Sequence, residues 1–130
     1  MQEKRRFSTW FFIAKAPDAA IEIDNGEIHE FEWVCPCNLV NSTPNPKRIL
    51  FPPTYISLHR LMNAQSADMV CEDISRSETE FFETKIEKSE TTFTALWRGD
   101  SAYNGTDLNA EGPRRRLVMG AKQWNYVTST

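Results

Sequence analysis

The sequence lacks the long apolar segments that mark membrane and exported proteins. Its first apolar run, Trp10–Ala14, is far shorter than the roughly 20 residues that a membrane-spanning helix needs. No small-residue cleavage site follows this run, so the basic and then apolar start does not indicate a secretory signal. The three cysteines are an odd number and too few for a disulfide framework. We therefore expect reduced thiols and a cytoplasmic protein that has no membrane association.

Glycine and histidine are also scarce, with five and two residues. Neither a glycine-rich phosphate loop nor a G-x-S-x-G nucleophile motif is present. The residues alone therefore give little support for a P-loop enzyme or a serine hydrolase. A net charge of −3 argues against general affinity for nucleic acid or for anionic membranes.

What the sequence does contain is enough apolar material for a core. Hydrophobic residues make up 40% of the 130 residues, and eight Phe, four Trp and three Tyr are among them. A chain of this length forms one domain and buries roughly two thirds of the surface that it exposes when unfolded. We expect an α/β (α+β) fold, a mixed sheet with one or two helices.

The first half of the chain predicts two strands and two helical segments. Aromatic and β-branched residues dominate 6–15, and "EIHEFEWV" at 27–34 has the alternation of a strand. Pro36 suits the first position of a short helical turn over 36–41. Apolar residues at helical spacing predict a helix from Tyr55 to about Ala64, with Thr54 as its cap.

The last third is predicted to be rich in strands, and 66–79 receives no assignment. Four short segments have strand composition, and the Ser89–Glu90 turn predicts that the first two form a hairpin. The four segments are 80–88, 91–97, 115–120 and 123–129. Within a single domain 1–130, we therefore separate 1–65 from a β-rich extension, 66–130.

Aromatic residues of the two early strands are predicted to form a core. Trp10, Phe12, Phe31 and Trp33 would pack together against the Tyr55–Ala64 helix. Burial of such side chains contributes roughly 1.5–3 kcal/mol each.

Two glutamates and three cysteines are the candidates for a metal site. Glu30 and Glu32 share one face of the predicted strand and could hold a divalent cation, although such residues are more often the solvated face of a strand. Cys35 and Cys37 have one residue between them, whereas zinc and redox pairs usually have two. We expect neither a disulfide nor a metal site at Cys35, Cys37 or Cys71.

The basic cluster Arg114, Arg115 and Arg116 could meet a phosphate. The alternative is that alternate arginines of a strand simply point to solvent, and we favour this reading. "RGD" at Arg98–Asp100 matches a cell-adhesion tripeptide, which we attribute to chance. His59, on the predicted helix, is interpreted as a surface or packing residue.

Four motifs in order resemble the Nudix hydrolases, in the branch of the peroxisomal coenzyme A diphosphatases and their bacterial relatives. "RFSTWFFIA" at 6–14 is similar to a strand R-[YF]-D-T-x-F-F-x-A, and "GEIHEFEWVCPCNLV" at 26–40 is similar to G-E-x5-W-x-x-P-x-E-A-L. "FPPTYISLHRL" at 51–61 resembles L-P-P-T-x3-L-x-x-L. "RGDSAY" and "PRRRL" loosely match a C-terminal P-G-D-x-x-Y and P-R-x-R-L.

The resemblance implies a partial Nudix fold and a family activity. That activity is metal-dependent hydrolysis of nucleoside diphosphate-linked compounds, including coenzyme A derivatives, with Mg²⁺ or Mn²⁺ as cofactor. The Nudix box, G-x5-E-x7-R-E-U-x-E-E-x-G-U, does not occur in these 130 residues, and Ser8 stands where the family usually has Asp. The chain reads as the C-terminal half of a Nudix protein, which would be inactive alone and would self-associate or pair with an N-terminal half.

Two other functions remain open. The chain could be a non-catalytic binding or interaction module that pairs with another polypeptide. A small nucleic-acid-binding domain that uses Arg114–Arg116 is a further alternative, although the negative net charge disfavours it.

Overall fold

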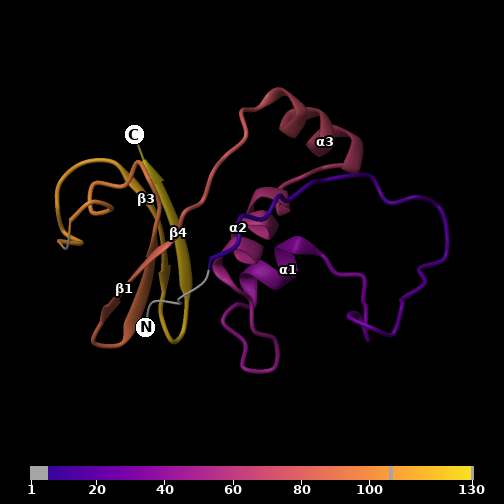
Figure 1. Cartoon of the computed structure of the whole chain (residues 1–130), viewed down its shortest axis with the longest axis horizontal. Coiled ribbons are helices and arrows are strands. Elements are labelled where there is room, and N and C mark those ends of the chain that lie inside the picture. The colour runs from indigo at the N-terminus through magenta and orange to yellow at the C-terminus, as the bar shows by residue number, and fades with distance from the viewer. Residues whose placement is uncertain (1–5, 106, 130) are drawn as a thin grey trace. The chain divides into compact units, whose positions relative to one another are not determined.

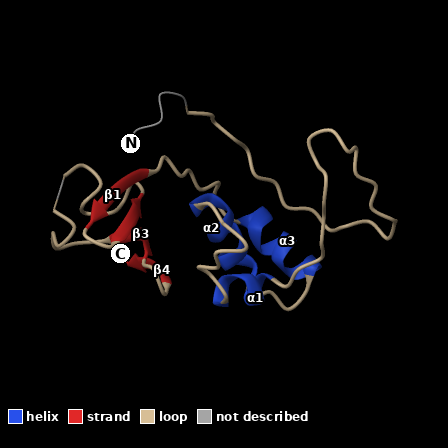
Figure 2. Ribbon diagram, turned by 90° about the horizontal axis from the view of Figure 1, so that it is seen from below, coloured by secondary structure: helices blue, strands red, loops and turns tan. Residues whose placement is uncertain are grey.

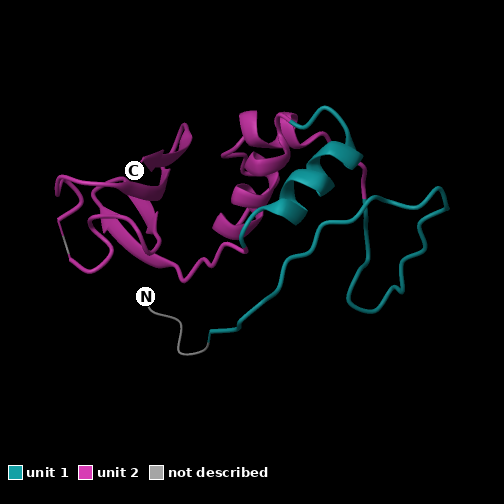
Figure 3. Cartoon of the chain, turned by 90° about the horizontal axis from the view of Figure 1, so that it is seen from above, with its two compact units in different colours: residues 1–31, 64–78 teal, residues 32–63, 79–130 magenta. Residues whose placement is uncertain are grey.

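The computed structural model describes residues 6–105 and 107–129 and divides into two compact units that interleave along the chain. One unit comprises residues 1–31 and 64–78, and the other comprises 32–63 and 79–130 (Figure 3). Within the described residues there are three helices and four strands. The mixed α+β class is thus confirmed, with a sheet that is antiparallel throughout.

The second unit contains the whole sheet, in the order β1-β2-β3-β4 (Figure 1). Its strands are β1 (Lys85–Ser89), β2 (Thr92–Leu96), β3 (Arg114–Met119) and β4 (Trp124–Ser129). β2 and β4 lie within segments that the sequence predicts as strands, β1 ends one residue after its predicted segment 80–88, and β3 begins one residue before its predicted segment 115–120. Ser89 pairs with Thr92 across a two-residue turn, so the predicted hairpin is also confirmed.

Two helices of the same unit cover one face of the sheet (Figure 2). They are α1 (Pro36–Asn41) and α2 (Pro52–Leu61), and each begins on proline, whose fixed φ favours the first helical turn. The short helix at 36–41 is confirmed. The second helix begins three residues before the predicted Tyr55, at Pro52, so Thr54 lies inside its first turn and is not the cap.

The main core lies between α1, α2 and this face. Trp97 and Leu117 are fully buried there beside Tyr55 of α2. The Trp97 ring meets Phe82 edge-on at 5.2 Å, and its Nε1 donates to Thr84 Oγ1 at 2.9 Å. The aromatic core of this protein therefore forms in the C-terminal strands.

The opposite face of the sheet is covered by the loop between β2 and β3. Leu96 of β2 packs there with Ala102, Tyr103 and the partly buried Leu108. Alternation along β2 explains the two cores, because neighbouring residues such as Ala95 and Leu96 point to opposite faces. This polar loop thus has a structural role.

The first unit contains one helix, α3 (Ala67–Arg76), and an extended N-terminal segment. Ser66 caps α3 by accepting a hydrogen bond from the Met69 amide at 3.1 Å. The sequence analysis left this segment unassigned. The helix has no buried residue, although its apolar residues Ala67, Val70, Cys71 and Ile74 have the spacing of a helical stripe, a signal that the sequence analysis did not use.

The predicted strands at 6–15 and 27–34 are wrong, because the described residues of both segments have no strand pairing. Trp10, Phe12, Phe31 and Trp33 are exposed, so the core predicted from them is also wrong. The β-propensity of a residue reflects how well its side chain packs on the half-buried surface of a paired strand. These segments have that composition, but no neighbouring strand pairs with them within the described chain.

No helix among the described residues is long and apolar enough to cross a membrane.

Candidate functional site

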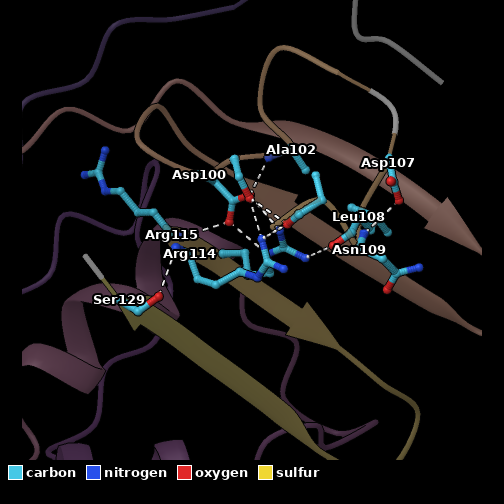
Figure 4. A network of polar contacts seen from close by, with 11 residues as sticks. Asp100, Ala102, Asp107, Leu108, Asn109, Arg114, Arg115 and Ser129 are labelled. Atoms are coloured by element: carbon cyan, nitrogen blue, oxygen red, sulfur yellow. Dashed lines mark hydrogen bonds and ion pairs between the residues drawn. The ribbon is translucent and has the colours of Figure 1, made fainter. Parts of the chain in front are cut away.

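Arg116 of β3 and Asp100, in the loop that covers the sheet, form a buried ion pair. Figure 4 shows Asp100 within the network of polar contacts around this loop. Arg116 Nε donates to Asp100 Oδ2 at 2.8 Å and Nη2 donates to Oδ1 at 2.6 Å. The Asp100 side chain is fully buried and that of Arg116 is 9% exposed. This bidentate geometry is the strong form of the arginine–carboxylate contact.

Two backbone amides complete the coordination of the Asp100 carboxylate. Ala102 N donates to Oδ1 at 2.9 Å, and Arg115 N donates to Oδ2 at 2.8 Å. Burial alone raises the pKa of this carboxyl, but the hydrogen bonds from Arg116 and from the two amides outweigh burial and lower the pKa to about 2. Arg116 also donates through Nη1 to Leu108 O at 2.9 Å, so one residue of β3 binds the loop at both Asp100 and Leu108.

Arg114 and Arg115 are also bonded within the chain. Arg114 Nη1 donates to Ala110 O at 2.7 Å and to Ser101 Oγ. Arg115 lies on the opposite face, with its guanidinium carbon 4.5 Å from the Phe82 ring centroid, and it donates to two backbone carbonyls. The expectation that alternate arginines point to solvent is therefore wrong, because Arg116 is buried and its two neighbours bind backbone and side-chain oxygens. All three side-chain nitrogens of Arg116 are thus engaged inside the protein, as is Nη1 of Arg114 and of Arg115.

Burial of Asp100 also answers the question of the "RGD" tripeptide. An adhesion site must present its carboxylate to the partner, and this carboxylate is enclosed by Arg116 and by backbone amides. The structure thus supports the reading of Arg98–Asp100 as a chance match.

The two glutamates named as weak candidates for a metal site both lie on the surface. Glu32 makes an ion pair with Arg48, and Glu30 is exposed. No cluster of three or more His, Cys, Asp or Glu able to hold a metal occurs in the described part of the chain. Cys35, Cys37 and Cys71 are free thiols, and the absence of a metal or disulfide there stays a prediction.

His59 is a packing residue, as the sequence suggested. Its ring lies edge-on to Tyr126 at 5.2 Å and 6.2 Å from Tyr55. The pKa of the Tyr126 hydroxyl is raised, first by burial and then by the charge of Glu80. These rings join α2 to β4, and their geometry indicates a structural contact.

Most of the exposed large apolar side chains in the described residues lie at 7–34, in and between the two segments that the sequence assigned to strands. Phe7 and Phe12 are 85% and 87% exposed, and Trp33 is 71% exposed. The other exposed large side chains here are Trp10, Phe11, Ile21, Ile28, Phe31 and Val34. Such a concentration of exposed apolar side chains on one stretch indicates an interaction site. We therefore take 7–15 and 27–34 as the candidate functional site and name them the exposed β-forming segments.

No protein-family model, no curated protein and no solved structure matches this chain. The Nudix relationship therefore depends on the sequence motifs and stays a prediction.

Proposed function

We propose that the chain is the back half of a Nudix-type diphosphatase and that it acts together with a polypeptide that carries the Nudix box. The observation that carries this proposal is the order of four motifs, from "RFSTWFFIA" through "GEIHEFEWVCPC" and "FPPTYISLHRL" to "PRRRL". By resemblance, the substrate class is a nucleoside diphosphate linked to a second group, with coenzyme A derivatives among the candidates.

The exposed β-forming segments are evidence that a second polypeptide takes part in this function. Residues 7–15 carry apolar side chains on both faces of a potential strand, as expected of a strand inside a covered sheet. Left unpaired, this strand would expose Trp10 and Phe12 to water, at a cost of roughly 1.5–3 kcal/mol each relative to burial. Pairing with strands of the second polypeptide would recover that free energy.

The residues of this chain do not fit the Mg²⁺ or Mn²⁺ that the family requires. Mg²⁺ demands oxygen ligands in near-octahedral geometry. Glu32 is already paired with Arg48. Among the described residues, Glu30 and Glu32 have no further acidic, histidine or cysteine side chain beside them that would complete a metal site. Arg116 is the buried arginine of the "PRRRL" motif, and Asp100 neutralises its charge. We therefore assign metal binding to the Nudix-box polypeptide and expect the chain alone to be inactive.

A phosphate-release assay tests this proposal. The chain alone, and the chain fused behind a Nudix-box polypeptide of the same branch, are assayed with Mg²⁺ or Mn²⁺ against coenzyme A and a panel of nucleoside diphosphate derivatives. We expect turnover only from the fusion. Turnover by the chain alone, lost in Glu30→Gln and Glu32→Gln variants, would place the catalytic site in this chain and contradict the proposal.

A non-catalytic interaction module is the second candidate, and the same exposed segments favour it. Such a module would bind a partner polypeptide through 7–15 and 27–34 with no hydrolysis by the complex. A fusion that folds, protects these segments and still releases no phosphate from any substrate would favour this candidate.

A further inference from the structure

The two edges of the sheet differ in how far they are covered. Backbone bonding alternates along each strand, and the bond from Trp97 N to Arg115 O at 3.1 Å fixes the alternation between β2 and β3. Carried through the pairing of Ser89 with Thr92, this alternation directs the N–H and C=O groups of Ile86 and Lys88 away from β2. These groups form the outer edge of β1.

Helix α2 covers the beginning of the other edge. The same alternation directs the carbonyl of Trp124 outward from β4, and Tyr55 Oη donates to this carbonyl at 3.4 Å. The Tyr55 and Trp124 rings lie 5.3 Å apart. No hydrogen bond to the outward backbone groups of Ile86 or Lys88 is found within the described part of the chain, so β1 is the open edge.

The side chains of β1 have a self-complementary order. Lys85 and Glu87 project from one face, and Ile86, which is 50% exposed, projects from the other. Lys85 is held in place, because its Nζ donates to Tyr103 O at 2.8 Å and lies 4.4 Å from the Tyr103 ring centroid. Glu87 is exposed.

We propose that β1 pairs antiparallel with β1 of a second copy of this chain, about a twofold axis at Ile86. The two Ile86 residues then exchange backbone hydrogen bonds, and their exposed side chains meet. Lys85 of each copy lies directly opposite Glu87 of the other on the same face, where opposite charges stabilise an antiparallel pair. The twofold axis closes the assembly as a dimer with one continuous sheet.

The charges also select the register. Displacing the two strands by two residues in one direction brings Lys85 opposite Lys85, and in the other direction brings Glu87 opposite Glu87. Either displacement sets like charges against each other, which is destabilising. Lysines often protect sheet edges from association. Here the order of Lys85 and Glu87 permits one register of the paired strands and opposes the two registers displaced from it by two residues.

Analytical ultracentrifugation of the whole chain over a concentration series tests this proposal. Glu87→Lys turns both cross-axis pairs repulsive, and we expect it to weaken the dimer by about tenfold or more. An equimolar mixture of Glu87→Lys and Lys85→Glu chains should restore dimerisation, because each lysine then meets a glutamate of the other variant. Association through residues 7–34 would respond to neither change.

Ile86→Pro provides a second variant that does not depend on charge or on the Lys85–Tyr103 contact. It removes an outward N–H and no bond of the β1–β2 ladder, so it should yield a folded monomer. Thr128→Pro is its matched control, because it removes an outward N–H from β4 and should leave the dimer intact.

Circular dichroism verifies that each variant is folded. A wild-type chain that is monomeric at all concentrations would overturn the proposal. So would a folded Ile86→Pro variant that dimerises as strongly as Thr128→Pro.

Discussion

Loss of the Asp100 carboxylate should strongly destabilise the second unit. Replacing Asp100 with Asn conserves its size but removes the charge that neutralises Arg116. The Asp100 carboxylate accepts hydrogen bonds from both sides of the loop, from Ala102 N and from Arg115 N, in addition to the arginine. An Asn in this place directs an NH₂ group at one of these donors, so at least one buried donor loses its acceptor.

The expected loss in free energy of unfolding is about 3–5 kcal/mol, the usual result of leaving one charge of a buried pair uncompensated. Asp107→Asn is the matched control in the same loop. Asp107 is exposed and accepts one hydrogen bond, from Asn109 N at 2.9 Å, so its replacement should change stability by no more than about 0.5 kcal/mol.

Urea unfolding followed by tryptophan fluorescence measures both variants, because the buried Trp97 reports on the main core of the same sheet. A variant Asp100→Asn that is as stable as Asp107→Asn to within about 0.5 kcal/mol would refute the reasoning. The ion pair would then contribute nothing beyond the packing around it.

Three further predictions follow from the cores and the titratable groups. The folded-state pKa of Asp100, about 2, lies below its usual value of 3.8. The stability that the ionised Asp100 contributes is therefore complete above about pH 4 and is lost as the pH falls toward 2. The urea midpoint of the wild type should fall over this range, and the part of the fall that is due to Asp100 should be missing from Asp100→Asn. Trp97→Ala should destabilise the protein by about 3–5 kcal/mol, whereas Trp10→Ala should change the unfolding midpoint little, because Trp97 is fully buried and Trp10 is 69% exposed. Denatured protein should show three reactive thiols and purified protein should contain no stoichiometric zinc, and fewer thiols or bound zinc would contradict the prediction made for Cys35, Cys37 and Cys71.

The C-terminal sheet could be predicted because its signals are local. Residues 91–97 and 115–120 have strand composition, and a two-residue turn joins the first hairpin. Pro36 gave the position of the first helix, and apolar residues at helical spacing gave the approximate position of the second. In these segments local propensity and tertiary packing agree.

The N-terminal segments could not be predicted in the same way, because strand formation needs a partner that composition does not supply. Trp33 lies in a segment of strand composition and is nevertheless 71% exposed. The Asp100–Arg116 pair was missed for a different reason. Its two members are 16 residues apart, and only the folded loop brings the acid to the arginine.

Hydrogen exchange of residues 7–15 and 27–34 tests the central claim most directly, since these segments are proposed to pair with a Nudix-box polypeptide. Their backbone amides should exchange fast in the chain alone and slowly in the fusion to that polypeptide, while the amides of Ala95 and Leu117 are protected in both. Fast exchange of the two segments in a folded fusion, or strong protection in the monomeric chain alone, would contradict the account.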